Sequence, residues 1–477
     1  DNPADTLIVT SSQKMSNVSE DFKKLKATDL AVITSKRIVF IVDECHRSVF
    51  GDMLLTIKHT FPKAIFFGFT GTPIQDENQV QKNTTATVFG DELHRYSIAD
   101  GIRDGNVLGF DPYKVLTFAD DDLRTQVALE QAKAKTVEEV FANPAKKKKF
   151  LEFKNKVPMA GHYESDGSYT KGIEDYVPLV QYRTEVHQSK VVEDILKNWF
   201  VLSQNGKFHA IFATSSIPEA LEYYRRIKAA KPDLKVIALF DPSIDNVDGA
   251  TIKENGLKEL IEDYNERYNQ NFAIPTWAKM KKDIAARLAH KKPYERIERE
   301  PEKQIDLLIV VNQMLTGFDS KWINTLYLDK ILEYANVIQA FSRTNRLFGK
   351  DEKPFGTIKY YRKPHTMEKN IEAAVKLYSG NKPLGLFAQR LGKNLLLMNS
   401  FFAQIKDLFE LARIPNFEKL PEDPAERKKF ASLFREFNDY LAAAKIQGFT
   451  WGKLTYKVEI DNSSKKQEIA LALNETT

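Results

Sequence analysis

The amino-acid sequence predicts an α/β protein with two lobes, followed by a helical region. Three apolar runs do not alternate with polar residues, at positions 38–42 (IVFIV), 64–69 (AIFFGF) and 305–311 (IDLLIVV). Such runs are typical of strands that are buried on both faces of a parallel sheet. Stretches of helical composition separate them, as βαβ units require. From about residue 366 the sequence changes to long amphipathic segments, which predict helices.

We expect three regions along the chain. Residues 1–186 predict part of a first lobe and a linker, residues 187–365 a second lobe, and residues 366–477 a helical carboxy-terminal region. Further strands are expected at residues 7–10, 210–214, 236–240, 325–328 and 357–361, and a helix at residues 335–346. Residues beyond 450 are compatible with either a hairpin or an ordered tail. A lysine run at 146–149 fits either a solvated helix face or a patch that contacts phosphates.

Composition restricts the classes of function. The 477 residues are 42% hydrophobic and carry a net charge of +5, which permits nucleic-acid binding. The longest apolar runs fall short of the ~18–20 residues that a membrane span needs. The single cysteine, Cys45, fits a reducing compartment such as the cytoplasm. Because the chain starts DNPAD, without a methionine or a signal region, we expect a segment cut from a longer protein.

An acidic pair, Asp43 and Glu44, directly follows the apolar run 38–42. Open α/β sheets bind their ligands at the carboxyl ends of strands. One carboxylate there can hold Mg²⁺, and its neighbour can orient or deprotonate an attacking water. The residues therefore predict a nucleotide-hydrolysing site, in which either carboxylate could be the metal ligand.

A tight turn, TGTP, follows the run 64–69 and contains Thr70 and Thr72. Hydroxyl groups beside the carboxylates can relay the state of a bound nucleotide to the rest of the lobe. An ordinary Gly-Pro turn explains the same residues, and the sequence alone leaves both interpretations open.

A cluster of donors, Gln339, Arg343 and Arg346, falls within the predicted helix 335–346. At offsets of four and seven, the amide and the two guanidinium groups would share one helix face. Arginine offers fixed, bidentate donors to phosphoryl oxygens and remains charged, as a group that contacts a transition state must. A solvated amphipathic helix is the alternative.

Three polar loops each follow a predicted strand. In the loop TGFD, we expect Gly317 to let the backbone approach a ligand, and Asp319 to hold an arginine or a ribose hydroxyl. Hydroxyl, amide and helix N–H groups also suit contacts with phosphates that do not depend on sequence. A plain helix cap or turn is an equal alternative for each loop. The candidates for nucleic-acid contacts are Thr10, Gln13, Lys14, Ser215 and Thr316.

The order of these motifs resembles the ATP-driven translocases of helicase superfamily 2. The resemblance narrows to the motor-endonuclease (R) subunit of type I restriction-modification enzymes and covers most of residues 7–362. The stretches that carry it are IVFIVDECHRSVFGDM, FFGFTGTPI, TTATVFGDELHRYSIADGIRDGNVLGF, IEDYNERYNQNF, LLIVVNQMLTGFDSKWINTLYLDK and VIQAFSRTNRLFG.

This resemblance implies two RecA-like lobes that clamp ATP and Mg²⁺ and move along double-stranded DNA. Asp43 is similar to the carboxylate on the Mg²⁺ side and Glu44 to the general base. His46 resembles the residue that couples the nucleotide to the turn with Thr70 and Thr72. Matches also extend to the finger arginines and the glutamine beside them, namely Arg343, Arg346 and Gln339. Methyltransferase and specificity subunits are the implied partners, with the region after 366 as the docking element.

The chain departs from the family pattern in one respect. It contains no G-x-x-x-x-G-K-[ST] loop, which in this family comes before the Thr10 region together with the nuclease. We therefore expect residues 1–477 alone to hydrolyse ATP poorly. Two other functions stay open, another superfamily 2 motor for repair or remodelling, and a non-catalytic module that grips DNA or a partner.

Overall fold

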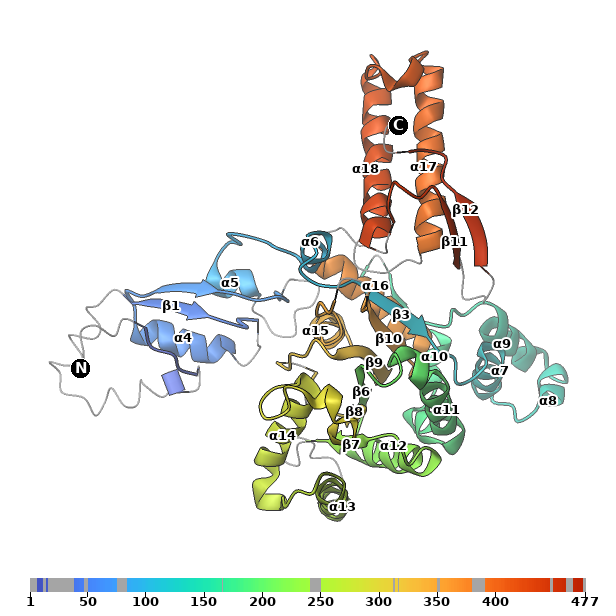
Figure 1. Cartoon of the computed structure of the whole chain (residues 1–477). Coiled ribbons are helices and arrows are strands. Elements are labelled where there is room, and N and C mark those ends of the chain that lie inside the picture. The colour runs from blue at the N-terminus through green and yellow to red at the C-terminus, as the bar shows by residue number, and fades with distance from the viewer. Residues whose placement is uncertain are drawn as a thin grey trace. The chain divides into compact units, whose positions relative to one another are not determined.

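The computed structural model describes most of the chain and divides it into two compact units (Figure 1). One unit ends at Ile98 and the other begins at Ala99, and each is described by itself. The described residues are 7–11, 14–15, 38–46, 50–74, 84–164, 166–240, 250–311, 314–315, 317–349, 352–379, 391–446, 449–459 and 466–474.

The first unit contains a βαβ arrangement. Strands β1 (Val39–Val42) and β2 (Ile65–Gly68) pair in parallel, and helix α4 (Phe50–Thr60) connects them. Leu54 of α4 and the following Phe61 are buried. The ring of Phe61 lies 5.4 Å from that of Phe40 in β1, so the helix side covers one face of the strand pair. A short helix, α5 (Thr85–Phe89), follows.

The other face of this strand pair differs from the prediction. Residues 38–42 were expected to be buried on both sides, yet Val39 and Ile41 are 52% and 71% exposed. Phe67 and Phe69, at and beyond β2, are also exposed on the described structure. A continuous apolar run indicates that both faces of a strand can be buried. The described elements of this unit cover only one face of the strand pair. Residues 7–10, expected to form a strand, lie in irregular, exposed structure.

The second unit is built on a parallel sheet of six strands. Their order is β3-β10-β9-β6-β8-β7, and every pairing is parallel. The strands β6, β7, β8, β9 and β10 are buried at every residue, as their apolar runs predict. The bounds are β3 (Phe110–Lys114), β6 (His209–Thr214), β7 (Val236–Leu239), β8 (Leu307–Val310), β9 (Ile323–Asp329) and β10 (Gly356–Tyr360).

Helices connect these strands and flank the sheet (Figure 1). They are α11 (Glu185–Leu202), α12 (Ile217–Ala230), α13 (Ala250–Tyr268), α14 (Trp277–Ala289), α15 (Tyr334–Phe341) and α16 (Pro364–Tyr378). Helix α6 (Ile98–Arg103), which begins at the last residue of the first unit, comes before β3. Short 3₁₀ turns lie at Leu179–Arg183, Ile274–Thr276, Ile297–Arg299, Pro301–Lys303 and Pro415–Phe417. Helix α12 begins as predicted for a proline in the first turn, and its cap residue Ser216 accepts from the N–H of Glu219.

Strand β3 lies outside the region where we expected the second lobe. The predicted division near residue 186 assigned it to the first lobe and its linker. In the structure Phe110 pairs with Gly356, and the whole strand extends the second unit's sheet beyond β10. The ring of Phe110 also lies 5.4 Å from that of Phe341. The structure thus divides the chain after Ile98, and the three-region division stays a prediction.

A helical cluster follows β3. Helices α7 (Asp120–Gln131), α8 (Val137–Phe141) and α9 (Pro144–Asn155) share buried side chains that include Val127, Val140 and Phe153. Next comes a hairpin of two short strands, β4 (His162–Tyr163) and β5 (Tyr169–Thr170), and then helix α10 (Ile173–Tyr176). The lysine run lies on α9, where Lys146 and Lys149 pair with glutamates, which favours a solvated face.

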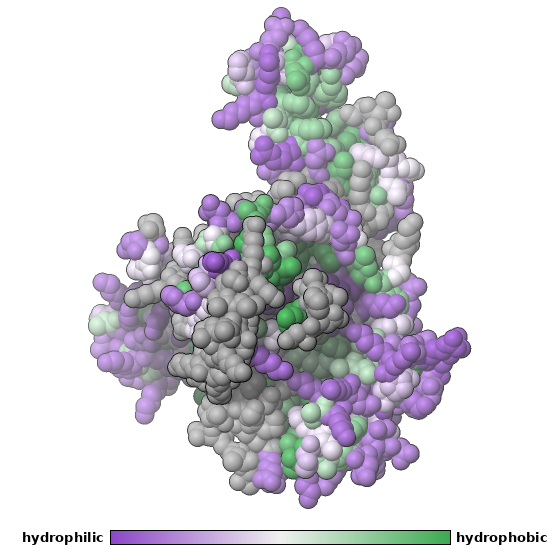
Figure 2. All heavy atoms as spheres, turned by 90° about the vertical axis from the view of Figure 1, so that its left-hand side faces the viewer, coloured by the Kyte–Doolittle hydropathy of each residue, from purple (hydrophilic) through white to green (hydrophobic). Residues whose placement is uncertain are grey.

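The carboxy-terminal region is a helical hairpin with a β-hairpin. Helices α17 (Leu391–Leu411) and α18 (Pro424–Ile446) lie side by side (Figure 1), and β11 (Thr455–Glu459) pairs antiparallel with β12 (Lys466–Ala470). Of the two alternatives that the sequence left open beyond residue 450, a hairpin or an ordered tail, the structure has the hairpin. Figure 2 shows hydrophobic residues on this part between polar borders, and Leu411 is 80% exposed. None of the helices in the described ranges is long and apolar enough to span a membrane.

Candidate functional site

The acidic pair lies in a turn that begins where β1 ends. Both Asp43 and Glu44 are exposed. The N–H of Glu44 donates to Oδ1 of Asp43 at 2.9 Å, and Glu44 has a left-handed backbone with φ of 51°. The N–H of Cys45 donates to the carbonyl oxygen of Phe69 at 3.1 Å, which ties the turn to the segment after β2. The carboxylates thus occupy the carboxyl end of a parallel strand pair, where α/β sheets place ligands.

His46 connects the acidic turn to the TGTP turn. Its Nδ1 lies 2.7 Å from Oγ1 of Thr70 and 3.3 Å from Oε2 of Glu44. Oγ1 of Thr70 also accepts the N–H of Thr72 at 3.0 Å, and Thr72 is buried. A continuous polar path therefore runs from a carboxylate through an imidazole to the turn after β2. These contacts agree with the coupling that we expected of His46, and its function stays a prediction.

The donor set of this turn suits Mg²⁺. Magnesium binds through one or two carboxylates, keeps several waters and completes its shell with phosphate oxygens. Asp43 and Glu44 are adjacent, exposed carboxylates, so both are accessible to such an ion among the residues that the structure describes. The buried thiol of Cys45 is a poor ligand here, because burial raises its pKa to about 11.

In the second unit, two arginines hold the TGFD turn. Nη1 of Arg343 donates to the carbonyl oxygen of Phe318, and Nε of Arg346 donates to Oδ1 of Asp319 at 2.6 Å. Nε of Arg343 also donates to the carbonyl oxygen of Gln339 at 3.1 Å. The sequence-predicted residues Gln339, Arg343, Arg346 and Asp319 therefore lie together. Gly317 has φ of 73°, a left-handed conformation that favours glycine at the start of the turn.

The helix expected over residues 335–346 ends early. Helix α15 (Tyr334–Phe341) stops before both arginines, so they do not share a helix face with Gln339 as predicted. Ser342 Oγ donates to the carbonyl oxygen of Ile338, and Thr344 Oγ1 donates to that of Phe341. Such hydroxyl contacts compete with helix continuation. The following carbonyl, of residue 345, accepts from the segment before β3 instead of from the helix.

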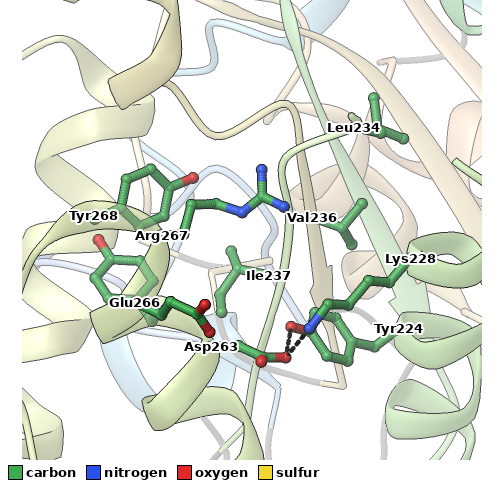
Figure 3. Close-up of a pocket in the computed structure, with 10 residues that line it drawn as sticks. Tyr224, Lys228, Leu234, Val236, Ile237, Asp263, Glu266, Arg267 and Tyr268 are labelled. Carbon is green, nitrogen blue, oxygen red and sulfur yellow. Dashed lines mark hydrogen bonds and ion pairs between the residues drawn. The ribbon is translucent and has the colours of Figure 1, made fainter. Parts of the chain in front are cut away.

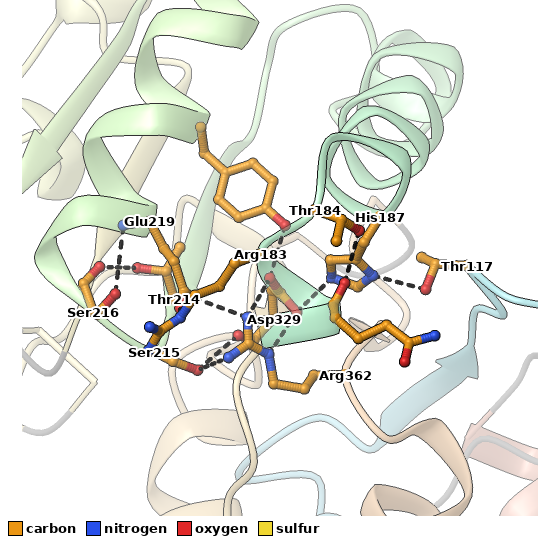
Figure 4. Close-up of polar contacts among 12 residues, drawn as sticks. Thr117, Arg183, Thr184, His187, Thr214, Ser215, Ser216, Glu219, Asp329 and Arg362 are labelled. Carbon is orange, nitrogen blue, oxygen red and sulfur yellow. Dashed lines mark hydrogen bonds and ion pairs between the residues drawn. The ribbon is translucent and has the colours of Figure 1, made fainter. Parts of the chain in front are cut away.

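Ser215 lies within a buried charge network at the carboxyl ends of β6, β9 and β10 (Figure 4). Its Oγ accepts from Nη1 of Arg362 at 2.8 Å and donates to the carbonyl oxygen of Asp329 at 3.1 Å. Arg362 also donates to both carboxylate oxygens of Asp329, and to Glu219 at 2.8 Å. The hydroxyl of Ser215 is thus occupied by internal contacts, and its proposed contact with nucleic acid stays a prediction.

Asp329 is the centre of this network. It is fully buried, and its Oδ2 accepts from the hydroxyl of Tyr223 at 2.7 Å. Its Oδ1 lies 3.0 Å from Nε2 of His187, whose Nδ1 lies 2.8 Å from Oγ1 of Thr117. Hydrogen bonds and charge from His187 and Arg362 outweigh burial and lower the pKa of Asp329. The hydrogen-bonded series Thr117, His187 and Asp329 has the residue types of a catalytic triad, but all three residues are buried.

The remaining nucleic-acid candidates are only partly described. Thr10 is exposed in irregular structure, and Lys14 has helical structure, with its N–H donating to Oγ of Ser11. Gln13 and Thr316 lie outside the described residues.

Sequence reasoning missed the network around Asp329 and the buried Lys353. A signal existed for the network, because Asp329 and Arg362 each come at or just after the end of an apolar run. Opposite charges at the ends of neighbouring parallel strands can meet. For Lys353, a lysine in a polar loop, the sequence offers no signal.

A surface pocket of about 260 Å³ lies at the β7 edge of the sheet (Figure 3). Tyr224 and Lys228 of α12 both contact the carboxylate of Asp263, and Tyr268 donates to a main-chain carbonyl. None of the sequence-predicted site residues lines it. The polar groups named here already have hydrogen-bond or ion-pair partners within the protein.

Comparisons with known proteins agree with the motif order. The family described as Type I restriction enzyme subunit R domain 3 matches residues 206–363, and the SWI2/SNF2 ATPase family matches residues 2–149. The endonuclease subunit of a type I restriction enzyme from Staphylococcus aureus strain COL is 32% identical over 90% of this chain. The chain is a homologue of the endonuclease (R) subunits of type I restriction enzymes.

Two further comparisons show how much of each related protein aligns with this chain. An R subunit from Staphylococcus saprophyticus is 33% identical over 90% of the chain. The chain spans about 41% of the length of each of these two staphylococcal relatives. A solved fragment described as an HsdR subunit from Vibrio vulnificus aligns with 70% of the chain and 44% of its own, at 16% identity and a TM-score of 0.38.

Proposed function

We propose that this chain is the ATP-driven motor of a type I restriction R subunit, which translocates double-stranded DNA and so drives cleavage by the nuclease of the same subunit. The observation that carries the proposal is the connection from the acidic turn to the TGTP turn, in which His46 contacts both Glu44 and Thr70. Such a connection allows hydrolysis at the carboxylates to change the conformation of the lobe.

The residues have separate tasks in this proposal. Asp43 holds Mg²⁺, which neutralises charge on the phosphates, and Glu44 orients or deprotonates the attacking water. Arg343 and Arg346 supply guanidinium groups to the phosphoryl oxygens, with Gln339 beside them. That these guanidinium groups contact a nucleotide bound at the acidic turn is a prediction, because the arginines and the acidic turn belong to different units.

DNA and protein partners complete the proposal. We infer that Thr10, Gln13, Lys14, Ser215 and Thr316 grip phosphates of one strand. The helical hairpin of α17 and α18 carries exposed apolar side chains, including Leu411 and Phe434. Exposed apolar patches with polar borders mark surfaces for protein partners. We assign this hairpin to docking on the methyltransferase and specificity subunits.

The test replaces Glu44 by glutamine in a complete R subunit assembled with its partners. We expect Glu44→Gln to lower DNA-stimulated ATP hydrolysis by at least about 100-fold, because a general base contributes roughly 10²–10⁴. Binding of ATP should persist. The matched control is Glu193→Gln, an exposed carboxylate of α11. Unchanged hydrolysis in Glu44→Gln would refute the assignment. The alternative of a non-catalytic module predicts DNA affinity that depends on salt and not on nucleotide.

A further inference from the structure

Lys353 is a buried lysine in the segment that leads from the arginine-bearing turn to β10. Only 2% of the residue is exposed. Its Nζ donates to the carbonyl oxygen of Ile323 at 2.6 Å and to that of Lys321 at 3.1 Å. Among the described residues, no carboxylate forms an ion pair with it. A buried ammonium without a carboxylate partner is costly, so its two main-chain contacts need an explanation.

The geometry of the sheet explains the contact with Ile323. Strand β10 starts its pairing with β9 at Thr357 opposite Thr325, two residues after Ile323. The carbonyl oxygen of Ile323 therefore lies beyond the end of that ladder. Buried main-chain carbonyls need a hydrogen-bond partner, and the lysine side chain supplies it from the loop before β10.

Three basic side chains from one segment hold one turn. Arg343 contacts the carbonyl oxygen of Phe318, Arg346 contacts the carboxylate of Asp319, and Lys353 contacts the carbonyl oxygens of residues 321 and 323. The turn of residues 318–323 is also held by α14, because Oγ of Ser320 donates to the carbonyl oxygen of Leu288 at 2.7 Å.

The three contacts differ in what they allow. Side chains of Arg346 and Asp319 are 42% and 64% exposed, so this pair can open without burying a charge. The acceptors of Lys353 are main-chain carbonyls, and the lysine is buried beneath the turn. To bind phosphoryl oxygens, the arginines must break their contacts with the turn. Lys353 is buried, so it can keep its contacts with the turn when the arginines leave it.

We propose that Lys353 is a positioning residue, which keeps the turn of residues 318–323 in place while Arg343 and Arg346 exchange that turn for nucleotide phosphates. The inference rests on the proposed function and adds a residue to it. Lys353 touches neither nucleotide nor metal in this scheme. It acts through the turn that carries Asp319 and orients Arg346.

The charge of Lys353 responds to pH in the neutral range. Burial, and then the positive charge of Arg346, lower its pKa to about 7, while Asp319 acts in the opposite direction. Below that value the ammonium makes charge-assisted hydrogen bonds with both carbonyls, and above it the weaker amine remains. The turn should therefore be held more firmly on the acidic side.

The test compares pH profiles of kcat/KM for ATP, which report on groups of the free enzyme. A complete, assembled R subunit is used, with Lys353→Met and Lys353→Gln as variants. Lys231→Met is the control, because it removes an exposed lysine at the end of α12, outside the turn that Lys353 contacts. Each profile is normalised to its own maximum, so a smaller folded fraction does not alter its shape.

We expect the wild type and Lys231→Met to lose up to about tenfold in kcat/KM between about pH 6 and about pH 8. Both Lys353 variants should lack this limb. If Lys353→Met does not fold, Lys353→Gln decides, since it keeps two N–H donors without a titrating charge. If the profiles of the Lys353 variants run parallel to that of the wild type, the proposed role of Lys353 is overturned, and the proposed function of the chain is not. A wild-type complex without DNA-stimulated hydrolysis overturns the proposed function, and this inference with it.

Discussion

Nε of Arg346 lies 2.6 Å from Oδ1 of Asp319, in a pair whose side chains are 42% and 64% exposed. Exposed ion pairs contribute only about 0–1 kcal/mol to stability. The pair therefore orients the guanidinium group at little energetic cost to the fold, and it can open when a phosphate competes for the arginine.

Asp319→Asn should test whether Asp319 orients the guanidinium group of Arg346 or stabilises the fold. We expect the free energy of unfolding to change by less than about 1 kcal/mol. ATP hydrolysis by the complete subunit should fall by about tenfold or more, because small misplacements of a catalytic group are costly. Glu259→Gln is the control, since it removes the acceptor of a similar exposed pair with Arg225. Loss of stability without loss of hydrolysis in Asp319→Asn would contradict this interpretation.

Much of the second unit's sheet could be predicted from the sequence. Runs such as residues 210–214 and 305–311 are apolar at nearly every position, and a strand buried on both faces requires this. Polar residues that follow such runs also indicated where Ser215 and Asp319 lie. The acidic turn after β1 was located by the same signal.

Other features depend on contacts between distant segments. The end of α15 is set by hydroxyl groups of Ser342 and Thr344 and by the segment before β3, which local helical spacing does not register. Strand β3 contains Asp111 and Pro112, so its pattern does not indicate a sheet strand. The side chains that contact the carboxylate of Asp329, from His187, Tyr223 and Arg362, come from three separate segments, and no single stretch of sequence predicts that they meet.

The contact between His46 and Thr70 should be functional as a pair. We expect His46→Ala and Thr70→Val each to lower DNA-stimulated ATP hydrolysis by about tenfold, and the double variant to be no worse than the stronger single variant. Residues that act through one contact show this non-additivity in a double-mutant cycle. Thr60→Val serves as the control, because its hydroxyl contacts only the carbonyl oxygen of Thr56 within α4 among the described contacts. Additive losses would show that His46 and Thr70 act separately.

Arg362 and Arg183 share one acceptor, which offers a matched comparison of buried and exposed pairs. Arg362 is 3% exposed and Arg183 is 55% exposed, and each donates to one oxygen of Glu219. Removing one partner of a buried pair costs roughly 3–5 kcal/mol, because a charge remains buried without compensation. We expect that loss for Arg362→Met in denaturant unfolding. Arg183→Met should cost less than about 1 kcal/mol. Equal losses would show that the network is not the source of the stability.

The buried pair of His209 and His290 should make the second unit sensitive to acid. Their Nε2 atoms lie 2.8 Å apart, and burial lowers the pKa of His209 to about 3 and that of His290 to about 4. Between the usual value near 6.5 and these lowered values, the unfolded chain binds protons that the folded chain excludes. Stability must therefore fall as pH falls through this window, by up to about 1.4 kcal/mol per pH unit for each histidine.

Two substitutions test whether this pair causes the slope. His209→Leu removes one titrating group, and His290→Asn removes the other with a residue that tolerates the left-handed backbone, where φ is 48°. We expect each variant to flatten the dependence of unfolding free energy on pH between about pH 6.5 and about pH 4, even if it lowers stability at neutral pH. His162→Gln is the control, because His162 is 43% exposed beside Glu164. If the slopes of His209→Leu and His290→Asn match that of wild type, groups outside this pair bind the protons during acid unfolding.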